Sequence, residues 1–186
     1  NWIPDRWTIY QFTQMFSING YVSVPAFKYL MNSIIISSVS TVIAITIGMM
    51  GGYAFARFNF KGKNKIFLSL MLARAVPGIS LSLPLFILFA KIGLLNTSIG
   101  VIIVYVAMNV PFTIWLTDGF FRQIPKEMSE VARTDGCTRL QAFWNVELPL
   151  AGPGIGAAAI FAFLLSWNEY ALASIITRTV HSKTLP

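Results

Sequence analysis

Four apolar stretches with very few charged residues dominate the sequence, at about 32–56, 66–90, 99–121 and 153–176. A helix of about 20 apolar residues crosses the hydrocarbon core of a bilayer. Because no water is available there, a spanning segment must satisfy its own backbone hydrogen bonds, as a helix does. Only 11% of the residues are charged, whereas a typical soluble domain has about 25%. The sequence therefore predicts an all-α, polytopic transmembrane helical bundle with four spans.

Prolines interrupt the second of these predicted spans. Pro77 is followed by Gly78, and Pro84 lies two helical turns further on. A proline inside a helix removes a hydrogen bond and bends the axis. The spacing predicts two kinks that open on the same face of the helix.

Basic residues indicate how the spans are oriented. Four lie in the loop after the first span and four follow the third, whereas the connection between the second and third spans holds only Lys91. These eight basic residues are Arg57, Lys61, Lys63, Lys65, Arg122, Lys126, Arg133 and Arg139. Lys and Arg gather in cytoplasmic loops of membrane proteins. Both loops are therefore expected in the cytoplasm, and the net charge of +7 needs no nucleic-acid partner to explain it. Residues 1–28, which are rich in aromatic side chains, and residues 177–186 are expected to be extracytoplasmic or interfacial.

The long polar loop 122–149 is the most informative segment. Pro125 suits the first turn of a helix, since its missing N–H needs no partner there. Gly136 suits the left-handed residue that often follows the end of a helix. Thr138 and Gln141 have the spacing of a capping box, which predicts the start of a second helix. The loop is thus expected to form an elbow of two short helices.

The charges of this loop bear on what the elbow contacts. Four acidic residues, Glu127, Glu130, Asp135 and Glu147, offset the four basic ones. An amphipathic hairpin that rests on lipid usually has a strongly basic polar face, so balanced charge favours a groove in a partner protein. The pattern by itself leaves both interpretations open. Pro149 is expected to end the second helix.

The spacing of residues in the loop resembles the EAA signature of ABC importer permeases. That signature has Glu-Ala-Ala, a glycine after three residues, and Ile-x-Leu-Pro after nine more. The corresponding residues are Glu130-Val131-Ala132, Gly136, Val146 and Leu148-Pro149. In that family the elbow docks in a groove of the cytoplasmic ATPase subunit. The resemblance implies an ATPase-coupling element that comprises Glu130, Val131, Ala132, Asp135, Gly136, Leu148 and Pro149.

The resemblance extends over about residues 29–176. Five further motifs look like the maltose and oligosaccharide branch of these permeases: Asn32-Ser33, Tyr53-Ala54-Phe55-Ala56-Arg57, Gly93-Leu94-Leu95-Asn96-Thr97, Ile124-Pro125-Lys126-Glu127 and Trp167-Asn168-Glu169-Tyr170. Members of the family usually have six spans. The chain is therefore expected to lack part of the bundle at both ends.

Family resemblance also implies a function and a set of partners. It implies a type I ABC importer permease in the prokaryotic plasma membrane, with a sugar or oligosaccharide as substrate. The implied partners are a dimer of ATPase subunits, a second permease subunit, an extracytoplasmic solute-binding protein and membrane lipid. No nucleotide-binding loop is present in the sequence, so ATP hydrolysis is expected on a separate chain and not on this one. The alternatives are an ABC permease for another small polar solute and a secondary transporter.

Four polar residues within the predicted spans are candidates for the translocation path: Arg74, Asn109, Asn168 and Glu169. Polar groups at such depths usually face the bundle interior or a cavity. Arg74 either lines the path or extends its long side chain to the membrane surface. Asn109 either contacts solute or bonds backbone groups freed by Pro111. Asn168 and Glu169 belong either to the path or to the interfacial belt.

The sequence offers few residues for a disulfide, a metal site or a catalytic pair. The single cysteine, Cys137, excludes an internal disulfide, and the single histidine, His181, excludes a His-pair metal site. Serine and acidic residues show no spacing that suits a catalytic pair. We therefore expect no catalytic residue, metal or cofactor in this chain.

Overall fold

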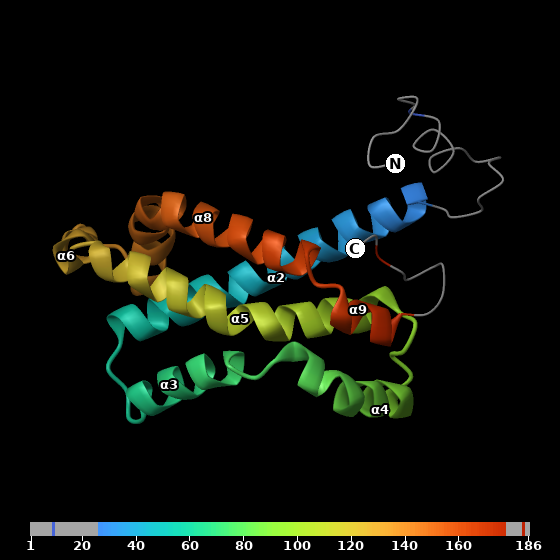
Figure 1. The fold of residues 1–186 in the computed structure, drawn as a ribbon. Coiled ribbons are helices and arrows are strands. Elements are labelled where there is room, and N and C mark those ends of the chain that lie inside the picture. Colours follow the sequence, from blue (N-terminus) through green and yellow to red (C-terminus); the bar gives the residue numbers. More distant parts are fainter. Residues whose placement is uncertain (1–8, 10–25, 178–183, 185–186) are drawn as a thin grey trace, which may run out of the picture.

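The computed structural model of the protein describes residues 9, 26–177 and 184, and within them the regular structure is helical. Three helical segments are long and apolar enough to cross a membrane. They are α2 (Ala26–Arg57), α5 (Ser98–Gln123) and the segment Arg139–Trp167, most of which is α8 (Leu148–Trp167). The three pack against one another along the molecule (Figure 1). The all-helical membrane fold predicted from the apolar stretches is confirmed, while nearly all of the predicted segment 1–28 lies outside the described residues.

Shorter helices connect or flank these three. They are α3 (Lys63–Arg74), the 3₁₀ helix η1 (Gly78–Leu81), α4 (Ser82–Ile92), α6 (Lys126–Thr134), α7 (Arg139–Ala142), the π turn η2 (Phe143–Glu147) and α9 (Ala171–Ile176). One apolar core joins α2, α4, α5 and α9, and a second joins the opposite ends of α2 and α5 to η2 and α8.

Small residues let α2 and α5 approach closely. Gly48 and Gly52 lie one turn apart on α2 and face threonines of α5. A Cβ atom added to Gly52 would lie 2.7 Å from the backbone nitrogen of Asp118, which no side-chain rotation can relieve. Interfaces between membrane helices are built in this way, because lipid supplies no hydrophobic force to press helices together.

Threonine hydroxyls then link the two helices. Thr113 Oγ1 donates to the Ala44 carbonyl at 3.0 Å, and Thr117 Oγ1 donates to the Gly48 carbonyl at 2.9 Å. Both threonine side chains are fully buried. These two hydroxyls are thereby satisfied across the interface, as a hydrocarbon environment requires of buried polar groups.

The second predicted span is broken. α3 and the η1–α4 segment meet at a bend of 90°, so they form either one interrupted span or a re-entrant loop. The break falls just before Gly78, where Pro77 has an extended backbone (φ −60°, ψ 127°). The expected second kink at Pro84 is wrong: Pro84 lies in the first turn of α4, where a missing N–H costs nothing.

The fourth predicted span begins earlier and ends sooner than 153–176. α8 starts at Leu148 and stops at Trp167, and α9 follows after a turn. The expectation that Pro149 ends the preceding helix is wrong. The π turn leads straight into α8, and Pro149 lies in the first turn of α8 without interrupting the helical run.

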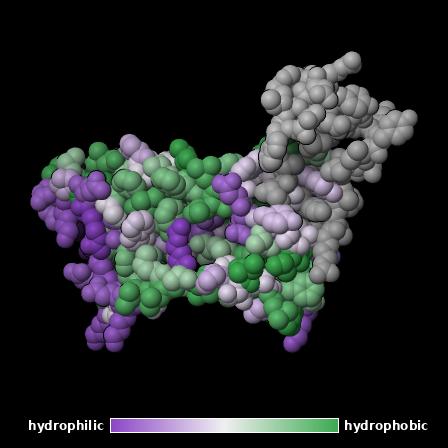
Figure 2. Space-filling view, in the orientation of Figure 1, coloured by the Kyte–Doolittle hydropathy of each residue, from purple (hydrophilic) through white to green (hydrophobic). Residues whose placement is uncertain are grey.

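The elbow and the basic loop between α2 and α3 lie at the same end of the molecule (Figure 1). Hydrophilic residues gather at this end, whereas apolar residues cover most of the middle (Figure 2). We refer to it below as the elbow end. This distribution is what a chain embedded in a bilayer requires.

We predict that Gly52→Ala lowers the stability of the α2–α5 pair by about 1–3 kcal/mol, since the added methyl group overpacks a closed interface. Thermal unfolding in detergent measures the effect. Gly119→Ala is the matched control, because a Cβ atom at Gly119 meets no atom within 4 Å. Equal melting temperatures for the two variants would contradict the packing argument.

Candidate functional site

The elbow folds as two short helices around a left-handed glycine. Pro125 precedes α6, and Gly136 follows α6 with a φ of +94°. Thr138 and Gln141 form the predicted capping box: each side chain accepts a hydrogen bond from the backbone N–H of the other residue, at 3.3 and 2.8 Å. Local sequence rules therefore predicted the first helix, the left-handed turn and the cap of the second helix, but not the continuation of the second helix into α8.

The residues proposed for ATPase coupling differ in exposure. Ala132 is buried against the rest of the elbow, and Leu148 is half-buried. The others are exposed: Glu130, Val131, Asp135, Gly136 and Pro149. Ala132 also accepts a hydrogen bond from the Cys137 N–H at 3.0 Å, across the turn at Gly136. Ala132 thus closes the elbow, while the exposed members are free to meet a partner.

Apolar side chains also project from the elbow. Val131 is 58% exposed, Leu140 66% and Trp144 49%. A monomeric soluble protein rarely exposes several large apolar side chains on so small a polar segment, and such a group often marks a protein interface. We call Val131, Leu140 and Trp144 the elbow surface.

An ion pair that sequence reasoning missed lies beneath the elbow. Arg57, the last residue of α2, donates from Nε to Glu147 Oε2, and the two side chains are only 8% and 1% exposed. The Tyr53 hydroxyl donates to the other carboxylate oxygen of Glu147 at 3.3 Å. Glu147 therefore does not belong to the balanced surface charge of the elbow, as the sequence suggested. Its place between apolar Val146 and Leu148 was the one signal that it is buried.

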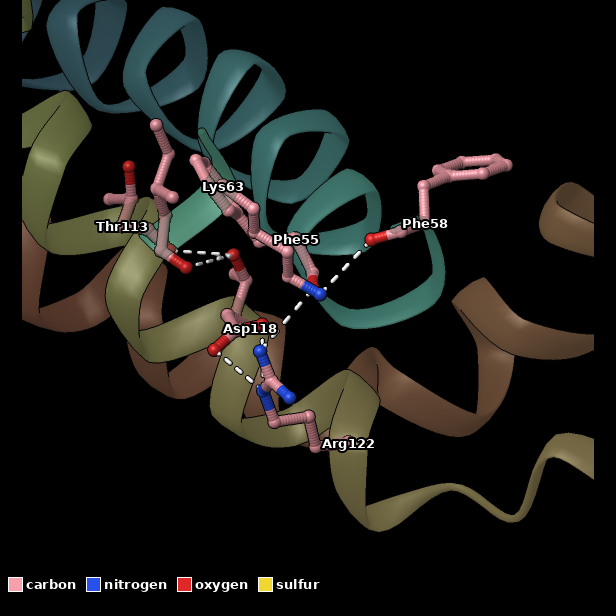
Figure 3. Close-up of polar contacts among 8 residues, drawn as sticks. Phe55, Phe58, Lys63, Thr113, Asp118 and Arg122 are labelled. Carbon is pink, nitrogen blue, oxygen red and sulfur yellow. Dashed lines mark hydrogen bonds and ion pairs between the residues drawn. The ribbon is translucent and has the colours of Figure 1, made fainter. Parts of the chain in front are cut away.

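A second ion pair lies within α5, and its guanidinium also bonds the end of α2. Arg122 Nε lies 2.9 Å from each carboxylate oxygen of Asp118, one turn earlier on α5. Its Nη2 donates to the Phe55 carbonyl at 3.3 Å. Figure 3 shows Arg122 between these two acceptors, with Lys63 reaching the Phe58 carbonyl nearby. The basic residues of this end thus donate hydrogen bonds to backbone carbonyls near helix ends.

A pocket of about 270 Å³ lies at the break between α3 and η1. It brings together three of the four residues predicted for the translocation path: Arg74, Asn109 and Glu169. Tyr105 and Ser166 line it as well. Asn168 is outside it, exposed, and donates to the Leu164 carbonyl of its own helix.

Hydrogen bonds hold the walls of this pocket. Asn109 Nδ2 donates to Ser166 Oγ at 2.8 Å, so the amide links α5 to α8 and does not repair the backbone near Pro111. The Tyr105 hydroxyl donates to the Glu169 carbonyl at 2.6 Å. Arg74 lies over the Phe112 ring, 4.1 Å from its centre. The pocket therefore has fixed polar walls and a guanidinium that a π-face holds in place.

No group of three or more His, Cys, Asp or Glu residues within the part of the chain that the structure describes is arranged to hold a metal ion. The polar groups of the pocket are instead hydrogen-bond donors and acceptors of mixed type. Such a set suits recognition of a polar molecule.

The chain is similar in sequence to permease components of bacterial transport systems. A family model described as "Binding-protein-dependent transport system inner membrane component" matches residues 44–182. The trehalose transport system permease protein SugB of Mycobacterium tuberculosis is 41% identical over 157 residues, which are 84% of this chain and 57% of that protein. The inner membrane ABC transporter permease protein YcjP of Escherichia coli is 33% identical over 184 residues, 99% of this chain and 65% of that protein.

A diacetylchitobiose uptake system permease protein, DasC of Streptomyces coelicolor, is 35% identical over 158 residues, 85% of this chain and 57% of that protein. The chain thus spans 57–65% of the length of these relatives. In structure it is similar to a chain of a bacterial ABC transporter that imports the acidic polysaccharide alginate. The TM-score is 0.72 at 23% identity, over 95% of this chain and 70% of that one, and this likeness supports the fold alone. Because the family model covers most of the chain, the protein belongs to the family of inner membrane components of binding-protein-dependent transport systems.

Proposed function

We propose that the chain is a permease subunit of an ATP-driven importer, which forms part of the translocation path and couples to a separate ATPase subunit. The observation that carries this proposal is the elbow with EAA spacing. It is compact, turns at left-handed Gly136 and exposes Val131, Leu140 and Trp144 at the elbow end. A polar elbow with projecting apolar side chains suits a groove in a protein better than a lipid surface.

In this proposal the elbow end lies in the cytoplasm. Lys and Arg are concentrated in its two loops, which is the charge asymmetry typical of cytoplasmic loops. The pocket at the α3–η1 break then lies further from the cytoplasmic surface than the elbow does. The other partners are a second permease subunit and an extracytoplasmic solute-binding protein.

Coupling would work by movement of the elbow as a unit. Glu130 offers an exposed carboxylate to a basic residue of the ATPase, a charge-assisted contact. α6 follows α5 after two residues, and η2 runs directly into α8. A displacement of the elbow by the ATPase dimer therefore reaches two long helices at once.

For the solute, we propose a sugar or oligosaccharide. The relatives are named for trehalose, diacetylchitobiose and sulfoquinovosyl glycerol, all of which contain sugar units. The pocket offers donors and an acceptor from Arg74, Asn109 and Glu169, which match a molecule rich in hydroxyl groups. We place these three residues in the translocation path and leave Asn168 outside it.

We predict that Glu130→Lys and Gly136→Val each uncouple ATP hydrolysis from uptake while the protein remains inserted in the membrane. The first reverses the charge offered to the ATPase, and the second puts a side chain on a left-handed residue at a cost on the order of 1–2 kcal/mol. ATPase activity and solute uptake are measured together in proteoliposomes that contain the assembled complex.

Gly152→Val is the control for the glycine, because Gly152 has an ordinary helical backbone and open space around its Cβ position. Wild-type uptake in both elbow variants would refute the coupling role. Failure of the wild-type chain to co-purify with an ATPase subunit would refute the importer function as a whole.

We also predict that Arg74→Gln raises the solute concentration for half-maximal uptake by about tenfold, since hydrogen bonds to charged groups contribute about 1.5–3 kcal/mol. Basal ATP hydrolysis should remain. Lys91→Gln is the matched control, because Lys91 belongs to the same broken span but does not line the pocket. If the two variants have equal uptake curves, Arg74 does not contact the solute.

A further inference from the structure

Arg57 joins three segments that are far apart in the sequence. It ends α2, its Nε bonds Glu147 at the end of the π turn, and its Nη2 donates to the Ile124 carbonyl at 3.1 Å. Ile124 lies just before the elbow begins, and Glu147 lies where the elbow ends. One guanidinium therefore holds the elbow at both of its ends.

Apolar contacts also join α2 to the elbow on this side: the rings of Tyr53 and Phe143 lie 4.6 Å apart, centre to centre. α6 packs on α7 and on the π turn. A pocket of about 230 Å³ lies between the end of α2 and the face of α6 that carries Ser129, Glu130 and Arg133. The Arg57–Glu147 pair lines the same pocket. Among the residues that the structure describes, the side-chain hydrogen bonds from α2 to the two ends of the elbow come from Arg57 and from Tyr53, which also donates to Glu147.

Stability alone does not explain a buried pair of this kind. Removing two charges from water costs about as much as their attraction returns, and well-packed apolar residues often stabilise a fold at least as well. What the pair adds is geometry. The planar guanidinium fixes the direction of two acceptors at once, which an ammonium group cannot do.

We propose that Arg57 and Glu147 are positioning residues that fix the angle between the elbow and α2, so that movement of the elbow is passed to α2 as well as to α5 and α8. The proposal rests on the proposed function, because it concerns how the coupling element acts. By this proposal α2 also receives the movement of the elbow, although α2 is not continuous with the elbow in sequence. The joint formed by Arg57, Glu147 and the Ile124 carbonyl is called the elbow joint below.

Glu147→Gln and Arg57→Lys test the elbow joint in the assembled complex. The first removes the carboxylate charge. The second keeps the positive charge but replaces the planar guanidinium that bonds two acceptors at once. We expect each to lower the solute transported per ATP hydrolysed by about tenfold, the upper range of couplings between distant sites, while ATPase binding persists. Arg122→Gln is the matched control: its guanidinium bonds Asp118 of its own helix and the Phe55 carbonyl of α2 but no residue of the elbow, so the ratio should stay near the wild-type value.

A distance measurement tests the joint without any transport. Nitroxide labels are placed on the native Cys137 in the elbow and on Lys61→Cys after α2, and the distance distribution is recorded by double electron–electron resonance. Each joint variant should broaden this distribution, and Arg122→Gln should not. The charge-conserving Arg57→Lys separates the two roles, since a requirement for charge alone would leave both readouts unchanged in that variant.

The proposal is overturned if both variants keep the wild-type transport ratio and the wild-type distance distribution. It is also overturned if both fail to insert, because the pair would then be needed to fold the chain and not to position the elbow. Absence of ATP-dependent uptake by the wild-type complex would instead sink the proposed function. In that case the distance distributions alone decide whether the joint holds the elbow.

Discussion

The close contact between α2 and α5 is the constraint on which the rest of the fold depends. Glycines at 48 and 52 remove the side chains that would separate the helices, and Thr113 and Thr117 bond the carbonyls thus exposed. In lipid, helices associate through close packing and satisfied polar groups rather than through water exclusion. Because α8 packs across both helices, an error at this contact would displace the elbow at one end and the pocket at the other.

The two candidate sites are built differently because they have different tasks. The elbow is made of short helices whose polar groups are satisfied locally, by the turn at Gly136 and the capping box of Thr138. It can therefore move as one piece. The pocket takes its walls from four helical segments, and its hydrogen bonds, such as that from Asn109 to Ser166, cross between helices. Its shape must change whenever those helices shift, which is a useful property in a path that opens and closes.

Sequence predicted those features that depend on near neighbours. The helices, the left-handed Gly136 and the capping box follow from residues within four positions of one another. Pro149 misled because a π turn before it lets one helix run into the next, and local propensity does not indicate that turn. Arg57 and Glu147 are separated by 90 positions, so their pairing required knowledge of how the ends of α2 and η2 meet. Polarity within apolar stretches selected four residues, of which the structure brings Arg74, Asn109 and Glu169 to one pocket and leaves Asn168 outside it.

The bend between α3 and η1 has a consequence for the surrounding solvent. Two helix ends meet there, so the backbone groups of residues 75–77 lack the full set of partners that a continuous helix provides. Hydrocarbon cannot bond such groups, and irregular backbone at membrane depth occurs only against protein or beside water. Residues 72–77 are exposed on the surface of the described chain. Water or a neighbouring subunit must therefore contact the bend on that side. A single copy of the chain in pure lipid would require water to penetrate the membrane locally at the bend.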